Sequence, residues 1–205
     1  MDGQTFLDEL RDEHETELSR LGSSKAVYAL TEGEMDGDAV RAGTARELHA
    51  IAPLLERWAE TADGDAAERY ADIAAFAADA LDAEAGGVEG GEATHITAEA
   101  LSDCGDGPAR AAGLAAALLV LGKLAEQLVG FFVGDADRAS ADEFRDIRDD
   151  LQGYRDDAAA LLDTLCQDDA DWTAAEETAD AVIEGAYDWY VDTLEAMGVE
   201  PKNVC

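Results

Sequence analysis

The sequence contains few basic residues, few prolines and few cysteines. Of its 205 residues, 14 are Lys or Arg and 48 are Asp or Glu, giving a formal net charge of −34. Nucleic-acid binding needs cationic side chains that displace counterions from phosphates, so this balance argues against a nucleic-acid partner. The same charge disfavours binding to an anionic membrane surface.

The cysteines do not form a recognisable framework. Cys104, Cys166 and Cys205 are an odd number without a C-x-x-C spacing, and they predict neither a disulfide framework nor a zinc site. Cys205 is the last residue, whereas a prenylated Cys is fourth from the end.

The sequence also lacks a clear membrane or export signal. The segment MDGQTFLDELRDEHE has neither a basic nor an apolar stretch, so we expect no signal peptide. The most apolar stretch, residues 109–133, contains Arg110, Lys123 and Glu126, which leaves its unbroken part short for a membrane span. These features predict a cytoplasmic protein with no membrane partner.

The acidity has a particular composition. Only three basic residues are Lys, and Asp outnumbers Glu by 27 to 21, while Leu, Val, Ile and Ala alternate with the acids. Self-repulsion of such a charge opposes compaction in dilute buffer. It nearly disappears in molar salt, where the screening length falls to roughly 3 Å. The pattern resembles proteins of haloarchaea, which implies a KCl-rich cytosol.

Abundant Ala and Leu, with only three prolines, favour helices throughout. No stretch alternates with period two for long enough to predict a strand. We expect one all-α domain over residues 1–205, with a glycine-rich connection at about 86–107 that contains one helical turn at 98–101. The expected helices, each with apolar residues three and four apart, are 5–30, 39–62, 66–85, 108–133, 141–166 and 173–197.

Some residues mark helix ends or irregularities. Asp38 can cap the second helix, and Pro53 predicts a kink or break within it. Pro108 stands where a first helical residue is favoured, and Gly198 is placed to end the last helix. The helix over 108–133 is apolar on nearly every face, which predicts a central, fully surrounded helix.

A polar cluster lies on the first predicted helix. Continuing the apolar stripe by heptads from Leu7 places His14 among leucines, beside Glu13 and Glu17. One interpretation is that the apolar stripe is shorter and that His14 lies at its solvent-exposed edge. The other makes Glu13, His14 and Glu17 metal ligands that face the interior, as in di-iron bundles.

Further candidate ligands lie on the second and fourth predicted helices. Glu47 and His49 are two residues apart and point in different directions, so they cannot share one metal ion from a regular helix. Glu126 stands in the most apolar helix. It is a ligand, a partner for Lys123 or Lys25, or a protonated acid.

The order of Ala-rich helices, the segment TARELHA and the segment LVGFFVGDADR resemble haloarchaeal rubrerythrin-like proteins of the ferritin superfamily, over about residues 1–170. The resemblance implies a ferritin-like four-helix-bundle core with additional helices. That family binds two irons through two Glu-x-x-His pairs. Here Arg46 stands three residues before His49, and Glu-x-x-His occurs only from Glu92 to His95, in the glycine-rich connection. The di-iron motifs therefore look degraded.

Two weaker interpretations involve the last helices. Cys166 close to Tyr187 and Tyr190 is compatible with a cysteine nucleophile, but a Cys in a helix is more often a small core residue. The aromatic residues Tyr187, Trp189 and Tyr190 are compatible with a pocket for a flat ligand. At helical spacing they more often form core.

Two functional hypotheses follow. The first is a non-catalytic or vestigial-site ferritin-like protein that acts by binding, with a second copy or another protein as candidate partner. The alternative is an iron- or manganese-dependent rubrerythrin-like oxidoreductase. Its candidate metal ligands are Glu13, His14, Glu17, Glu47, His49 and Glu126. The alternative requires carboxylates that converge inside the bundle, whereas the first requires an apolar or salt-bridged centre.

Overall fold

This computed structural model describes residues 1–81 and 95–201. Within these residues all the regular secondary structure is helical, and there is no strand. The all-α prediction is therefore confirmed for these residues. Their helices are α1 (Gly3–Glu13), α2 (Glu15–Leu21), α3 (Ser24–Leu30), α4 (Gly37–Thr61), α5 (Gly64–Asp79), α6 (Ala98–Ser102), α7 (Pro108–Gly134), α8 (Arg138–Leu165) and α9 (Asp169–Ala196). Buried apolar side chains from all of them form one continuous cluster.

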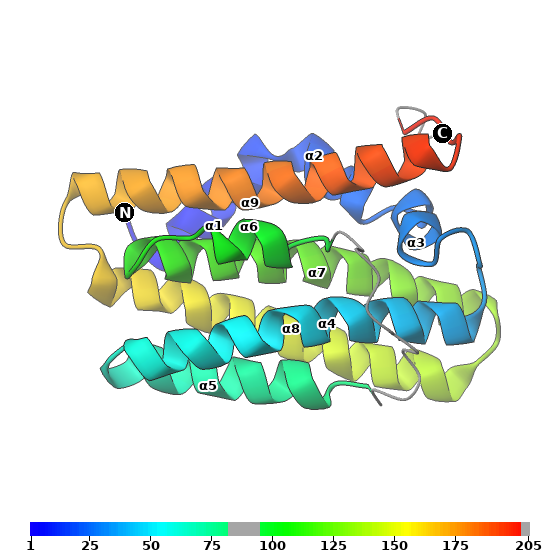
Figure 1. The fold of residues 1–205 in the computed structure, drawn as a ribbon, viewed down its shortest axis with the longest axis horizontal. Helices are drawn as coiled ribbons and strands as arrows, with labels where there is room; N and C mark the ends of the chain where they lie inside the picture. The colour runs from blue at the N-terminus through cyan, green and yellow to red at the C-terminus, as the bar shows by residue number, and fades with distance from the viewer. Residues whose placement is uncertain (82–94, 202–205) are drawn as a thin grey trace.

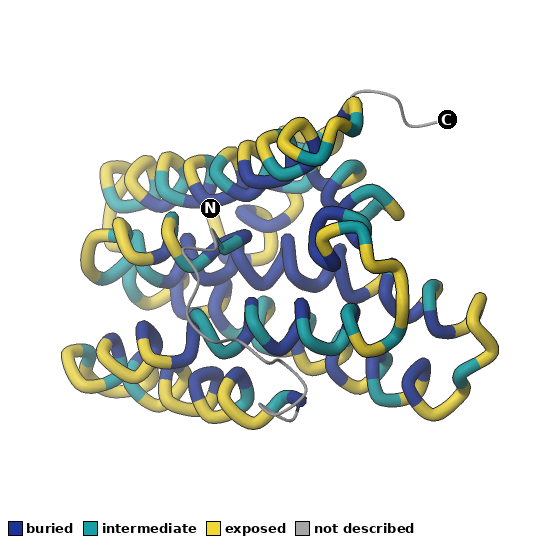
Figure 2. Tube along the Cα trace, turned by 45° about the vertical axis from the view of Figure 1, so that its right-hand side comes forward, coloured by how far each residue is buried: buried dark blue, intermediate teal, exposed yellow. Residues whose placement is uncertain are grey.

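Helix α7 is the central helix, as its uniformly apolar sequence predicts. It lies between α8 and α9 and also contacts α2, α3 and α6 (Figure 1). Buried residues run through the middle of the molecule, while buried and exposed residues alternate along the surrounding helices (Figure 2). Pro108 is the first residue of α7, where its missing N–H costs nothing.

By length and composition, α7 could span a membrane, contrary to the sequence-based expectation. In the structure 67% of its most apolar window is buried by the other helices. The core helix of a globular bundle meets the same criterion, because it too is apolar on every face. Burial within the bundle therefore accounts for the apolar character of α7.

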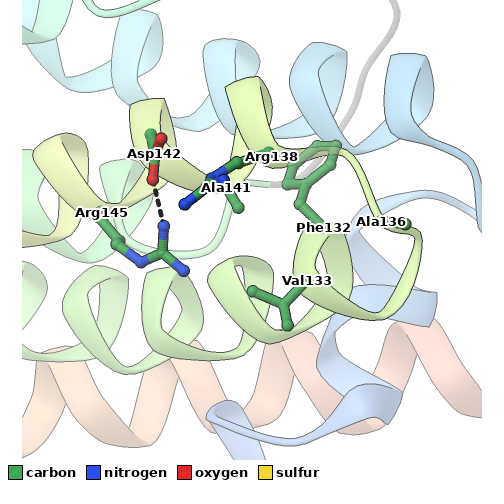
Figure 3. A pocket seen from close by; sticks show the side chains of 7 residues that line it. All are labelled: Phe132, Val133, Ala136, Arg138, Ala141, Asp142 and Arg145. Carbon is green, nitrogen blue, oxygen red and sulfur yellow. Dashed lines mark hydrogen bonds and ion pairs between the residues drawn. The ribbon is translucent and has the colours of Figure 1, made fainter.

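Helices α8 and α9 each begin about one turn earlier than the sequence pattern suggests, because an aspartate caps each start. The Asp137 carboxylate accepts a hydrogen bond from Ser140 N at 3.1 Å, and the Asp168 carboxylate accepts one from Ala170 N at 2.9 Å. The turn between α7 and α8 includes Ala136, whose φ is +61° (Figure 3). This tight turn makes α7 and α8 an antiparallel pair.

The prediction of one long helix over residues 5–30 is wrong, because this segment forms α1, α2 and α3. The first break is His14, with φ −104° and ψ 27°, and the second follows at Gly22. Gly22 lies against α7, since a Cβ added there would be 3.4 Å from the carbonyl oxygen of Lys123. The breaks let three short helices follow the surfaces of α7, α8 and α9.

The first helix packs on the end of the chain rather than on its sequence neighbours. Gly3 N donates a hydrogen bond to the Asp163 carboxylate of α8 at 2.7 Å. The rings of Phe6 and Trp172 approach to 6.3 Å between centroids, which joins α1 to α9. Helices α1 to α3 therefore depend on α7, α8 and α9 for their buried surface.

Helices α4 and α5 form a second antiparallel pair, on the side of α8 away from α9 (Figure 1). Helix α4 continues through Pro53 without a break. Its N-cap is Asp36, which accepts from Ala39 N at 2.9 Å, and not Asp38 as the sequence suggested. The predicted helical turn at 98–101 is present as α6, whereas residues 82–94 of the glycine-rich connection lie outside the described residues.

Candidate functional site

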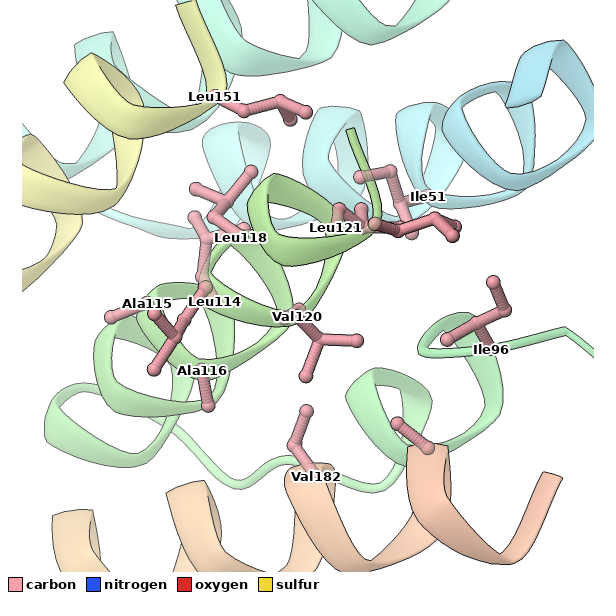
Figure 4. Packing of buried hydrophobic residues seen from close by; sticks show 14 of the residues in the cluster. Ile51, Ile96, Leu114, Ala115, Ala116, Leu118, Val120, Leu121, Leu151 and Val182 are labelled. Atoms are coloured by element: carbon pink, nitrogen blue, oxygen red, sulfur yellow. The ribbon is translucent and has the colours of Figure 1, made fainter. Parts of the chain in front are cut away.

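The centre of the bundle is apolar. Val120 and Leu121 of α7 pack in the same buried cluster as Ile51 of α4, Val182 of α9 and Ile96, which precedes α6 (Figure 4). All five of these side chains are at most 5% exposed. The position where a bundle protein would hold an interior metal is thus filled by aliphatic carbon.

Glu47 is the buried carboxylate among the candidate ligands, with 2% of the residue exposed. It accepts a hydrogen bond from Ile96 N at 2.7 Å and one from Arg46 Nε at 3.3 Å. The Nδ1 atom of His95 lies 3.6 Å from Oε1 of Glu47, the oxygen that accepts from Arg46. Glu47 thereby holds the segment that precedes α6 against α4.

The Glu47 carboxylate raises the pKa of His95 above its ordinary value, while partial burial of the imidazole acts in the opposite direction. The direction of this pKa shift means that the fold favours the charged form of His95. Its backbone N also donates to Glu99 at 3.3 Å, so the imidazole has two carboxylates in its surroundings. This arrangement is that of a structural contact, because both Glu47 oxygens already accept hydrogen bonds from Ile96 N and Arg46 Nε.

His49 does not join Glu47. The two residues lie two positions apart on a regular helix and point in different directions, as the sequence predicts. The Nε2 atom of His49 is buried and has no hydrogen-bond partner in the described part of the chain. It is the candidate residue whose polar atom is left unexplained by the contacts of the fold.

The three candidates of the first predicted helix lie near its break and on its surface. Glu13 is exposed and Glu17 half-buried, while His14 is the residue between α1 and α2. The Nε2 atom of His14 pairs with Asp180 of α9 at 2.9 Å. His14 therefore joins two surface helices and does not face the centre of the bundle.

Glu126 is exposed rather than buried. Its carboxylate is 45% exposed and accepts from Lys123 Nζ at 3.2 Å, one turn earlier on α7. Of the roles that the sequence left open for Glu126, pairing with Lys123 is the one seen. The apolar neighbours of Glu126 in the sequence are on other faces of the helix, so the apolar context did not indicate burial.

The thiols are held in their neutral form. Burial raises the pKa of Cys104 to about 11, and burial together with Asp171 raises the pKa of Cys166 to about 11. A thiol nucleophile works as a thiolate, so neither residue is activated for catalysis at neutral pH. Cys205 lies outside the described residues.

The aromatic residues of α9 lie in the core or contact helix α2. Trp189 and Tyr190 are buried, and the Tyr187 and Tyr190 rings stack at 5.9 Å between centroids. Arg20 of α2 donates to the Tyr187 hydroxyl and lies over its ring. These contacts fix α2 on α9 and leave the ring faces occupied by protein.

The candidate ligands consequently do not converge. In residues 1–81 and 95–201, no group of three or more His, Cys, Asp or Glu side chains is placed to hold one metal ion. Glu92, the first residue of the Glu-x-x-His sequence, is outside these ranges. The six residues remain predictions as metal ligands. No protein-family model, curated protein or solved structure matches the chain.

Little in the amino-acid sequence indicates the partners that these residues use. Asp180 lies 166 positions from His14, and Ile96 lies 49 positions from Glu47. The Ile96 partner is a backbone N–H, which has no sequence signature. His95 was the single indication, because the Glu-x-x-His spacing drew attention to it within the glycine-rich connection.

Proposed function

We propose that the chain is a non-catalytic, ferritin-like helical-bundle protein that acts by binding in a salt-rich cytoplasm. The observation that supports this most is that the Glu47 carboxylate is occupied by protein hydrogen-bond donors. A buried carboxylate in a metal-dependent bundle would offer its oxygens to the metal. Here both oxygens accept hydrogen bonds, from Ile96 N and Arg46 Nε.

The residues present do not fit a di-metal centre. Such a centre needs several carboxylates and imidazoles that project into the bundle interior. Glu126 and Glu13 are exposed, and His14 is paired with Asp180. The interior positions around Val120 and Ile51 are aliphatic instead. A vestigial site that has lost its ligands is the simplest account of a bundle built this way.

The charge supports a salt-rich compartment and disfavours several classes of partner. With a formal net charge of −34, the surface repels phosphate backbones and anionic lipids. Small ligands and other proteins remain as candidates for what the bundle binds. A second copy of the chain is among them, since screening in molar salt removes the repulsion between copies.

One observation favours the alternative, an iron- or manganese-dependent oxidoreductase. His95 Nδ1 lies 3.6 Å from the buried Glu47 carboxylate, and His49, two residues after Glu47 on α4, has an Nε2 atom with no partner among the described residues. This alternative requires Glu47 to exchange its contact with Ile96 N for a metal ion. The ligand set seen among the described residues is incomplete for such a centre.

Metal content measured by mass spectrometry distinguishes the non-catalytic binding protein from the metal-dependent oxidoreductase. The protein is purified in molar KCl without chelators, then reconstituted with iron or manganese, beside the variants Glu47→Gln and Glu56→Gln. Glu56 is exposed on the same helix and is the matched control. We expect no stoichiometric metal in any sample. About two metal ions per chain, lost in Glu47→Gln and kept in Glu56→Gln, would overturn the proposal and establish the alternative.

A further inference from the structure

A surface hollow lies where the end of α7 meets the first two turns of α8. Its volume is about 220 Å³. On α8, residues 138, 141, 142 and 145 recur at helical spacing and line one side, while Phe132 and Val133 of α7 line the other (Figure 3). None of these residues was a candidate in the sequence.

The wall of this hollow formed by α7 is apolar and open to solvent. Val133 is 55% exposed, one of the few large apolar side chains exposed in the described part of the chain. Ala136 is the other exposed apolar residue of the lining, while Phe132 and Ala141 form its buried floor.

The other wall contains a cation, Arg138, that has no partner among the described residues. Arg138 makes no hydrogen bond or ion pair with any residue in the described ranges, whereas Arg145 beside it pairs with Asp142. Carboxylates outnumber cations by 48 to 14 in this chain, so an unpaired guanidinium is unexpected. Most of the other described cations have a carboxylate partner, as Arg11 and Arg69 do.

We propose that this hollow binds a small carboxylic acid with an apolar body, its carboxylate on Arg138 and its body against Val133 and Ala136. A guanidinium presents paired N–H donors that match a carboxylate. One unpaired cation suits a monoanion, because Arg145 is already neutralised by Asp142. Two independent features, the open apolar wall and the unpaired Arg138, thus call for the two halves of one ligand.

The size of the hollow limits the ligand. An enclosed cavity of about 150 Å³ holds a benzene ring, so 220 Å³ accommodates one ring or a branched chain with its carboxylate. Larger, drug-sized ligands need about 300 Å³ or more. Benzoate is therefore a suitable probe of the class, although the natural ligand is identified only by its chemistry.

This inference rests on the proposed function, since both require the bundle to bind rather than to catalyse. Their failures remain distinguishable. Metal content tests the proposed function, while the hollow is tested by titration with an organic acid. A metal-containing protein could still bind benzoate, and a metal-free protein could fail to do so.

The experiment is a benzoate titration followed by backbone amide resonances at constant molar KCl. Benzamide supplies the same ring without the charge, and acetate supplies the charge without the ring. The variant Arg138→Gln removes the guanidinium. Arg57→Gln is the matched control, because Arg57 is also exposed and donates only to the carbonyl oxygen of Pro53.

We expect benzoate to shift the resonances of Val133, Ala136 and Ala141 with a dissociation constant of about 1 mM. Arg138→Gln should weaken binding about tenfold or more, while Arg57→Gln should leave it unchanged. Equal binding of benzamide or acetate, or shifts elsewhere on the molecule, would overturn the proposal. So would shifts at these residues that depend on protein concentration alone, which would identify a second copy as the occupant.

Discussion

Replacing Glu47 with alanine tests the tie between α4 and the segment before α6. The Glu47 residue is 2% exposed and accepts from Ile96 N at 2.7 Å. Its removal leaves a buried N–H without an acceptor, which costs about 1–3 kcal/mol. Breaking a buried ionic contact completely costs about 3–5 kcal/mol. Arg46 keeps other acceptors, Leu30 O at 3.1 Å and Glu32 at 3.5 Å, which places the expected loss near the lower bound of that range, about 3 kcal/mol.

The assay is equilibrium urea unfolding at constant molar KCl, followed by circular dichroism. Glu47→Gln retains an oxygen that accepts from Ile96 N, so its free energy of unfolding should fall by only about 1 kcal/mol. Glu56→Ala, an exposed change on the same helix, should stay within about 0.5 kcal/mol of the parent. If Glu47→Ala proves as mild as Glu56→Ala, the reasoning about the buried tie is wrong.

The contact between Glu47 and His95 makes the free energy of unfolding depend on pH, with a definite sign. Because the folded protein raises the pKa of His95, the folded state binds the proton more tightly than the unfolded chain. The stabilisation is complete below the unfolded pKa of about 6.5 and is lost as the pH rises through the higher folded value. The free energy of unfolding should therefore fall more steeply with rising pH in the parent than in His95→Gln. Parallel curves for the two proteins would contradict this.

The remaining predictions concern salt and packing. Because the net charge is −34, thermal melts should lose cooperativity in dilute buffer and regain it in molar KCl, and a melt insensitive to salt would count against adaptation to salt. Gly43→Ala should lower the free energy of unfolding by about 1–3 kcal/mol, since a Cβ there would lie 2.9 Å from Leu30 O. Gly122→Ala, where nothing lies within 4 Å, should instead raise it by up to about 1 kcal/mol, and urea titrations of both variants give the comparison.

The sequence predicted the helices well where the apolar pattern is strong. Helix α7 is apolar on every side and is central for that reason, and Pro108 marks its first residue. The short α6 was also predicted, within a segment that is otherwise rich in glycine. These features are local, so one stretch of sequence contains all the information that determines them.

The breaks at His14 and Gly22 were missed, because the apolar stripe continues across both. What ends α1 and α2 is contact with α9 and α7, as in the pair of His14 with Asp180. The same limit applies to the candidate ligands. A carboxylate such as Glu126 looks unusual among leucines in the sequence, but the face on which it lies is decided by three-dimensional packing. The ferritin-like arrangement of the bundle stays a prediction.

The packing of α1 on the end of the chain has a consequence for the order of events during synthesis. The apolar face of α1, with Phe6, Leu7 and Leu10, is buried only when α8 and α9 are available. At about 5–20 residues per second, a ribosome takes roughly ten seconds or more to reach them. Throughout that interval the first helices on the ribosome lack their partners, and the bundle closes around α7 only after most of the chain has emerged.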